Sequence, residues 1–198
     1  MPILRLLDMP KYKYKPLDND NEFRTLVISG TRKISGSSDE VLQCRLTTHP
    51  LPSKSPLRYD AISWNWGKYD EFKSIDIIGE DDQIHVLSVR PNLIKTLQGL
   101  RGKGETGRFW IDAVCIDQDN LHERDLQVQN MFEIYSSAAS VCIWLGGHAH
   151  NSSMALDFIQ HQVCDVAVFA TVTEGYTEEW KALAALMNRD WFSRKWGQ

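Results

Sequence analysis

The first half of the chain alternates short hydrophobic runs with polar ones, a pattern typical of β-strands separated by loops. Residues 3–8, "ILRLLD", and 41–51, "VLQCRLTTHPL", predict two strands. Between them, residues 29–40 are rich in glycine and serine and predict an exposed loop. Residues 74–79 and 83–88 are apolar runs separated by acidic turn residues, so they predict a β-hairpin.

The hydrophobic period changes at Pro91, which suits the first turn of a helix. Leu93, Leu97 and Leu100 keep helical spacing after it. Residues 108–116, "RFWIDAVCI", then form a nearly continuous apolar run. Such a run predicts a strand that is covered on both faces, as in a parallel or mixed sheet.

A long helix is predicted from Asn120, because Glu123 follows three residues later as in a capping box. Residues 140–147, "SVCIWLGG", predict the next buried strand, so strand, helix and strand form a βαβ unit. The helix is expected to pack through one apolar face. That face comprises Val128, Met131, Phe132, Tyr135 and Ala139.

The pattern is weaker beyond Gly147. A helix is expected to begin at Asn151 or Ser152, residues 163–172 suit a helix or a strand, and residues 177–187 predict a helix. The expected architecture is a single α/β domain over residues 1–198. Its central, mostly parallel sheet has flanking helices, extra N-terminal β-strands and a β-hairpin.

Composition excludes several classes of protein. The chain has 198 residues, 42% of them hydrophobic, and a net charge of −4, which argues against nucleic acid as a partner. No apolar run reaches the roughly 18–20 residues that span a bilayer, and Arg5 and Asp8 interrupt the apolar N-terminus. Residues 11–15, "KYKYK", are expected to form a solvated arm. A cytoplasmic protein is expected.

The cysteines give no sign of a metal site. The chain has four, Cys44, Cys115, Cys142 and Cys164, and they are widely spaced, without a CxxC pair or zinc spacing. They are expected to be reduced, buried thiols of a cytosolic protein, and no metal is expected.

Three blocks of sequence resemble the three motifs of the HET domain, the fungal heterokaryon-incompatibility domain. They are "YDAISWNWG" (59–67), "WIDAVCIDQDNLHERDLQVQNMFEIY" (110–135) with the following "WLG", and "RDWFSRKWGQ" (189–198). The resemblance covers roughly residues 40 to 198 and implies a cell-death effector of non-self recognition. Trp64 stands where the family usually has tyrosine, and Asp117 where asparagine is common.

A second resemblance is to TIR domains. "YDAISW" is similar to their first strand, and "QVQNMFEIYSSAASVCIWLG" to a helix, turn and buried strand of that fold. "DWFSRKWGQ" resembles the TIR helix that carries the catalytic glutamate, which would lie just beyond Gln198. This resemblance implies a TIR-like or flavodoxin-like arrangement, activation by self-association, and hydrolysis of NAD, with NAD as substrate and no permanently bound cofactor.

Candidate site residues lie where predicted strands end. Ligands of open α/β sheets bind beyond the carboxyl ends of the strands, so Ser63–Gly67 and Asp117–Asn120 are expected to share a cleft. The candidate catalytic carboxylates are Asp112 and Asp117. The candidate NAD-binding residues are Ser63, Trp64, Asn65, Trp66, Gly67, Arg189, Arg194 and Trp196.

Each candidate also has a structural interpretation. Asp112 lies inside an apolar run, so it is expected to pair with Arg124 or Arg194 unless it is catalytic. Trp64 and Trp66 suit a core as well as a cleft. For the whole chain, the alternative function is a non-catalytic, oligomerising signalling or adaptor module. Such a module kills cells by recruiting partners, such as regulatory domains or incompatibility proteins.

Overall fold

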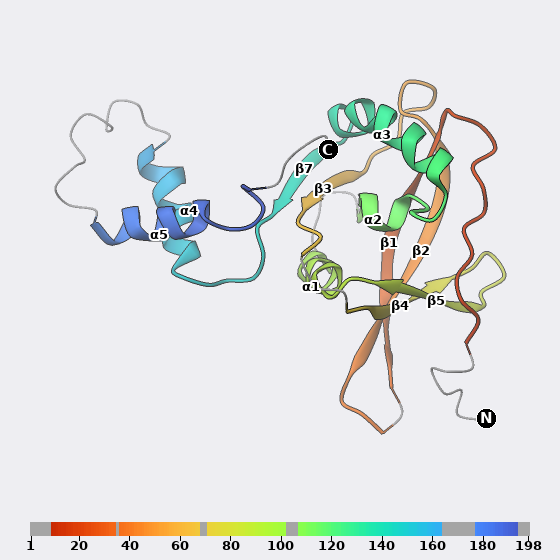
Figure 1. The fold of residues 1–198 in the computed structure, drawn as a ribbon, viewed down its shortest axis with the longest axis horizontal. Coiled ribbons are helices and arrows are strands. Elements are labelled where there is room, and N and C mark those ends of the chain that lie inside the picture. The colour runs from red at the N-terminus through yellow and green to blue at the C-terminus, as the bar shows by residue number, and fades with distance from the viewer. Residues whose placement is uncertain (1–8, 35, 68–70, 102–106, 164–176, 194–198) are drawn as a thin grey trace. The chain divides into compact units, whose positions relative to one another are not determined.

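The computed structural model describes residues 9–34, 36–67, 71–101, 107–163 and 177–193 (Figure 1). The chain divides into two compact units, Met1–Trp144 and Leu145–Gln198, which are described separately below. The assignment of one domain to residues 1–198 stays a prediction.

The first unit is built on a seven-stranded sheet in the order β5-β4-β2-β1-β6-β3-β7. The strands are β1 (Glu22–Lys33), β2 (Glu40–Pro50), β3 (Asp60–Trp64), β4 (Lys73–Ile78), β5 (Ile84–Val89), β6 (Arg108–Trp110) and β7 (Ser140–Trp144). Strand β3 pairs in parallel with β6 and β7, and β2 pairs in parallel with β4. The other neighbours are antiparallel, so the sheet is mixed. The predicted α/β class and the β4–β5 hairpin are confirmed.

Helices α1 (Pro91–Leu100) and α3 (Leu121–Ser136) cover opposite faces of this sheet. The β3 residue Trp64 pairs with Trp144, whose indole packs against Gly99 of α1. Tyr59 lies an odd number of residues from Trp64, so its side chain points to the other face. There its hydroxyl donates to the carbonyl of Ile134 in α3.

Two strand predictions need correction, and one lies outside the described residues. Strand β1 was not predicted, and it continues to Lys33, so the loop predicted for 29–40 is too long. The polar end of β1 pairs with β2 in a long hairpin ribbon (Figure 1). The run 108–116 is not one strand, because β6 ends at Trp110 and one helical turn, α2 (Asp112–Cys115), follows. Residues 3–8 lie outside the described part of the chain.

Helix α3 begins as predicted but packs through a different face. Asn120 caps it by accepting from the backbone N–H of Glu123 at 3.2 Å. The Glu123 carboxylate does not complete a capping box; it binds Arg24 instead. Val128 and Phe132 are 56% and 84% exposed, so the predicted apolar face is wrong at these positions, whereas Met131 and Tyr135 do pack against the core. The buried positions are Glu123, Gln127 and Ile134.

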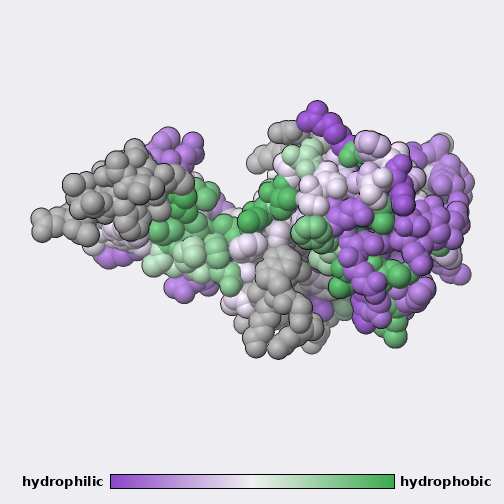
Figure 2. Space-filling view, turned by 90° about the horizontal axis from the view of Figure 1, so that it is seen from above, coloured by the Kyte–Doolittle hydropathy of each residue, from purple (hydrophilic) through white to green (hydrophobic). Residues whose placement is uncertain are grey.

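Two polar contacts explain this orientation of α3. Gln127 donates to the carbonyl of Glu22 at 2.7 Å, and Glu123 forms an ion pair with Arg24. Long-range hydrogen bonds therefore decide which face of α3 turns inward. On the face of the first unit seen in Figure 2, hydrophobic residues (green) lie among hydrophilic ones (purple).

The second unit contains α4 (Ser152–Phe158), the short π-helix Ile159–Val163 and α5 (Thr177–Met187). Asn151 precedes α4, as predicted. The buried hydrophobic residues that the structure describes in this unit are Ala155, Phe158, Ala182 and Leu186. Residues 164–172, which suited a helix or a strand, lie outside the described residues. Within the described chain, every helix is too short or too polar to cross a membrane.

Candidate functional site

Strand β3 ends at Trp64, and a tight turn follows it. The side chain of Asn65 accepts from the backbone N–H of Gly67 at 2.7 Å. Gly67 has a φ of +77°, a conformation that favours glycine. A Cβ at this position would lie 2.6 Å from Nδ2 of Asn92, the second residue of α1. The glycine therefore lets this turn approach the start of α1.

Asp112 holds the two tryptophans of this turn together. Its Oδ1 accepts from the indole N–H of Trp64 at 2.8 Å, and its Oδ2 from that of Trp66 at 3.1 Å. The two indoles are stacked, with ring centroids 6.0 Å apart and planes at 18°. Trp64 is 1% exposed and belongs to the core, whereas Trp66 is only partly buried.

These contacts change the interpretation of Asp112. The residue is 7% exposed, and its carboxylate is occupied by indole donors and by the N–H of Ala113 at 2.8 Å. Arg124, an expected partner, instead lies 4.0 Å from Asp125, so that pairing is wrong. Arg194 lies outside the described residues. Asp112 thus orients the tryptophans.

Two turns that are distant in sequence line one cleft of about 370 Å³, here called the tryptophan cleft. Trp64 and Trp66 come from the turn after β3, and Asp117, Gln118 and Asp119 from the bend before α3. The remaining lining residues are Lys11, Tyr14, Phe72, Leu87, Ser88, Val89, Arg90, Leu93 and Ala113. The structure therefore brings together the two segments that the strand-end argument singled out.

Asp117 and Asp119 both line this cleft, and Asp117 is the more buried of the two. Asp117 is partly buried, and its backbone N–H donates to Oε1 of Glu123 at 2.8 Å. The N–H of Asp119 reaches Oδ1 of Asp117 at 3.2 Å. The amide of Gln118 donates to the carbonyl of Asp112 at 2.9 Å, which ties this bend to the residue that orients the indoles.

Three residues of the cleft were not predicted as site residues. The guanidinium of Arg90 lies 5.9 Å from the ring centroid of Trp66 and donates to the carbonyl of Gly67 at 3.4 Å. Lys11 and Tyr14 come from the N-terminal segment that was expected to be a solvated arm. Tyr14 instead packs inward, and its hydroxyl donates to the carbonyl of Val114 at 2.9 Å. Alternating tyrosines in "KYKYK" were the only available hint.

The other predicted site residues lie elsewhere. Ser63 is 3% exposed within β3. Arg189 belongs to the second unit, where it donates to the carbonyls of Leu145 and Ala149, each at 3.0 Å. Arg194 and Trp196 fall outside the described residues.

Burial makes two thiols poor nucleophiles. It raises the pKa of Cys44 to about 12 and that of Cys115 to about 12. A thiol with such a pKa is almost entirely protonated at neutral pH. Among the described residues, no group of histidine, cysteine, aspartate or glutamate side chains is arranged to hold a metal ion.

Comparison with known proteins identifies the family. The family model "Heterokaryon incompatibility protein (HET)" matches residues 59–197. The chain therefore belongs to the HET family. Both turns of the tryptophan cleft lie inside the matched region.

One relative is the heterokaryon incompatibility protein 6, OR allele, of Neurospora crassa. It is 32% identical over 124 residues, which is 59% of this chain and 18% of the relative. The match thus spans less than a fifth of that protein's length. No solved structure matches the chain.

Proposed function

We propose that this chain is a cell-death effector domain of fungal non-self recognition, and that the tryptophan cleft hydrolyses NAD. Membership of the HET family and the similarity to an incompatibility protein support a role in heterokaryon incompatibility. The observation that carries the enzymatic part is the meeting of Trp66 and Asp117 in one cleft.

The chemistry of the nicotinamide–ribose bond explains why this meeting matters. The bond breaks through an oxocarbenium-like state, which a nearby carboxylate stabilises, as in glycoside hydrolysis. Asp117 supplies a carboxylate within the cleft. The half-buried indole of Trp66 offers a flat surface for a ring, and Arg90 beside it is a cation suited to a phosphate.

Self-association forms the second part of the proposal. By analogy with TIR domains, a further glutamate is expected to take part in catalysis, and contacts between copies would complete the catalytic site. The single domain and the assembled one are then two states, inactive and active, and self-association shifts the population toward the active state.

Nicotinamide release from NAD tests the enzymatic proposal. The chain is assayed at high concentration, with and without a C-terminal extension that supplies the glutamate. Asp117→Asn is expected to lower the rate of release at least tenfold, since it removes the charge that stabilises the transition state. Asp39→Asn, at an exposed position, is the matched control and should leave the rate unchanged. Equal rates for both variants, or no nicotinamide from the extended protein, would contradict an NAD-hydrolysing cleft.

An adaptor function is favoured by one observation, the exposed apolar side chains of α3. Phe132 is 84% exposed, Leu121 62% and Val128 56%, and apolar groups of this size on a helix suit a protein partner. Expression in a fungal host separates the two functions. An adaptor predicts that cell death survives Asp117→Asn but is lost in Phe132→Ser. An enzyme predicts loss in Asp117→Asn.

A further inference from the structure

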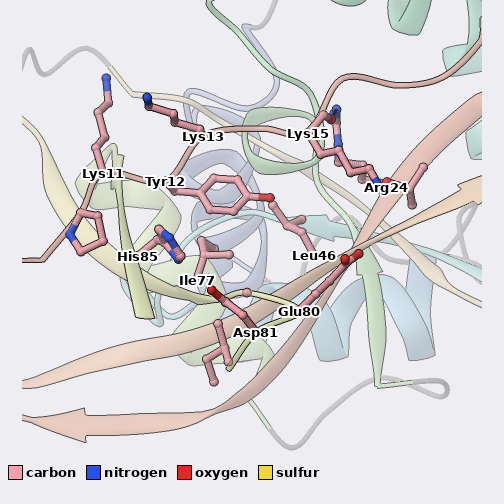
Figure 3. Close-up of a pocket in the computed structure, with 14 residues that line it drawn as sticks. Lys11, Tyr12, Lys13, Lys15, Arg24, Leu46, Ile77, Glu80, Asp81 and His85 are labelled. Carbon is pink, nitrogen blue, oxygen red and sulfur yellow. Dashed lines mark hydrogen bonds between the residues drawn. The ribbon is translucent and has the colours of Figure 1, made fainter. Parts of the chain in front are cut away.

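A second cavity, of about 510 Å³, is shown in Figure 3. It is here called the arm cavity, because one wall is the N-terminal arm (residues 10–15). The opposite wall is formed by β2, β4 and the turn from β4 to β5, with Leu46, Ile77, Glu80 and Asp81. Lys11 lines both cavities, so the arm separates the arm cavity from the tryptophan cleft.

The arm is fixed in place at both ends. The N–H of Tyr12 donates to the carbonyl of Val86 at 2.8 Å, and the N–H of Val86 to the carbonyl of Pro10 at 2.9 Å. At the other end, Nη2 of Arg24 donates to the carbonyl of Lys15 at 2.7 Å. The cavity is therefore preformed by backbone contacts, as ligand sites usually are.

Its two walls carry opposite charges. The arm bears Lys11, Lys13 and Lys15, whereas Glu80 and Asp81 stand on the other side of the Tyr12 ring (Figure 3). None of the three lysines forms an ion pair with any residue that the structure describes. The carboxylates of Glu80 and Asp81 are therefore not in direct contact with the lysine ammonium groups, and the two charges face each other across the cavity.

The three lysines create a local excess of positive charge on a chain whose net charge is −4. Figure 3 shows the ammonium groups of Lys11 and Lys13 turned away from Tyr12. Each is carried on a flexible four-carbon stem, which lets it swing to an anion at the mouth of the cavity. Arg24 also lines the cavity, but its guanidinium is engaged by Glu123, Cys115 and Lys15.

The interior of the cavity offers a ring surface. The Tyr12 ring lies between the walls, edge-on to His85 with centroids 6.3 Å apart. Nδ1 of His85 is buried and has no hydrogen-bond partner among the described residues. Because this atom is shielded from solvent, a ligand in the cavity packs beside the His85 ring and does not bond to Nδ1.

We propose that the arm cavity binds a nucleoside phosphate. Its phosphate lies at Lys13 and Lys15, its planar base packs on Tyr12 beside the His85 ring, and its ribose hydroxyls donate to Glu80. A cavity of about 510 Å³ has the volume of a small-molecule site. The arm precedes residue 59, where the family match begins, so this site adds to the tryptophan cleft.

Isothermal titration of the full chain with ADP tests the charge assignment. Replacing Lys13 and Lys15 together by alanine is expected to weaken binding at least tenfold, because the phosphate loses its cations. Lys54→Ala, at an exposed lysine of the loop after β2, is the matched control and should bind ADP like the wild type. Equal weakening in the control, or no ADP binding by the wild type at millimolar concentration, overturns the proposal.

Further ligands and variants locate the bound molecule. Pyrophosphate should bind at least tenfold more weakly than ADP, and 2′-deoxy-ADP should lose affinity relative to ADP in the wild type but not in Glu80→Gln. Pyrophosphate binding as tightly as ADP would overturn the assignment of the base and ribose. Asp117→Asn in the tryptophan cleft should leave ADP binding intact even where it removes nicotinamide release. Loss of ADP binding in that variant would place the ligand in the cleft and overturn the proposal.

Discussion

At the scale of single residues, Asp112 is the group that organises the tryptophan cleft. A carboxylate in an apolar segment needs hydrogen-bond donors, and two indoles supply them. The indole of Trp64 belongs to the core, while that of Trp66 lines the cleft. Asp112 therefore fixes the cleft wall relative to the core.

Replacing Asp112 by alanine is expected to destabilise the fold. The indole N–H of Trp64 would lose its Asp112 acceptor inside the core, at a cost of about 1–3 kcal/mol in the free energy of unfolding. Urea denaturation followed by tryptophan fluorescence measures this change. Asp119→Ala, at an exposed position of the neighbouring bend, is the control and should shift it by less than about 0.5 kcal/mol. Similar shifts in both variants would show that Asp112 does not anchor the indoles.

His49 is expected to make stability depend on pH. Burial, together with the nearby Arg108 guanidinium, lowers the pKa of His49 below its ordinary value of 6.5. The unfolded chain therefore binds a proton at a pH where the folded chain does not. The contribution of neutral His49 to the free energy of unfolding should be fully present above pH 6.5. It should be lost as the pH drops from 6.5 toward the lowered pKa of the folded state.

His49→Gln removes this titration while keeping a polar side chain beside Thr25 and Arg108. The free energy of unfolding, measured by urea titration at several pH values from about 5 to 7, should vary less steeply in the variant than in the wild type. An unchanged slope in His49→Gln would refute the assignment.

At the scale of helices and strands, the sequence predicted the elements whose signals are local. The leucine spacing after Pro91 predicted α1, the two apolar runs around an acidic turn predicted the β4–β5 hairpin, and the Asn120 cap predicted the start of α3. All three are observed, because each signal comes from residues close together in the sequence. The break after Trp110 and the orientation of α3 were missed. They depend on Asp112 and Gln127, whose partners lie far away in sequence.

The ion pair between Arg24 and Glu123 connects β1, α3 and the N-terminal arm. The two side chains are 2% and 6% exposed, and Nη2 of Arg24 lies 3.1 Å from Oε2 of Glu123. Arg24→Met leaves the Glu123 carboxylate buried without its cation, so a loss of about 3–5 kcal/mol in the free energy of unfolding is expected. Urea denaturation provides the measurement.

Two further variants complete this test. Arg24→Met combined with Glu123→Leu should recover part of the loss, because no buried charge is then left unpaired. Arg45→Met disrupts the exposed pair with Asp82 and should cost less than about 1 kcal/mol. A double variant no more stable than Arg24→Met alone would argue that the lost contacts, and not the stranded charge, dominate.

At the scale of the whole molecule, the rule that ligand sites lie at strand ends predicted that the tryptophan turn and the acidic bend meet. They do line one cleft, although the acidic bend follows α2 and not the end of β6 directly. The rule depends only on the βαβ arrangement, which the apolar periods revealed. The arm could not be placed in this way, because its position depends on a backbone bridge between Lys11 and Val86. Arg90 was missed for a related reason, since its contact with Trp66 exists only in the folded chain.

The first unit, Met1–Trp144, is expected to fold by itself. It contains the complete seven-stranded sheet and the main hydrophobic core, whereas the second unit has four buried hydrophobic residues among those that the structure describes. A core that small contributes too little burial to hold a fold of its own. A fragment of residues 1–144 should therefore show a cooperative urea transition and a near-ultraviolet circular dichroism signal from its buried tryptophans. A fragment of residues 145–198 should show neither. A disordered 1–144 fragment would mean that the sheet depends on the second unit for its stability.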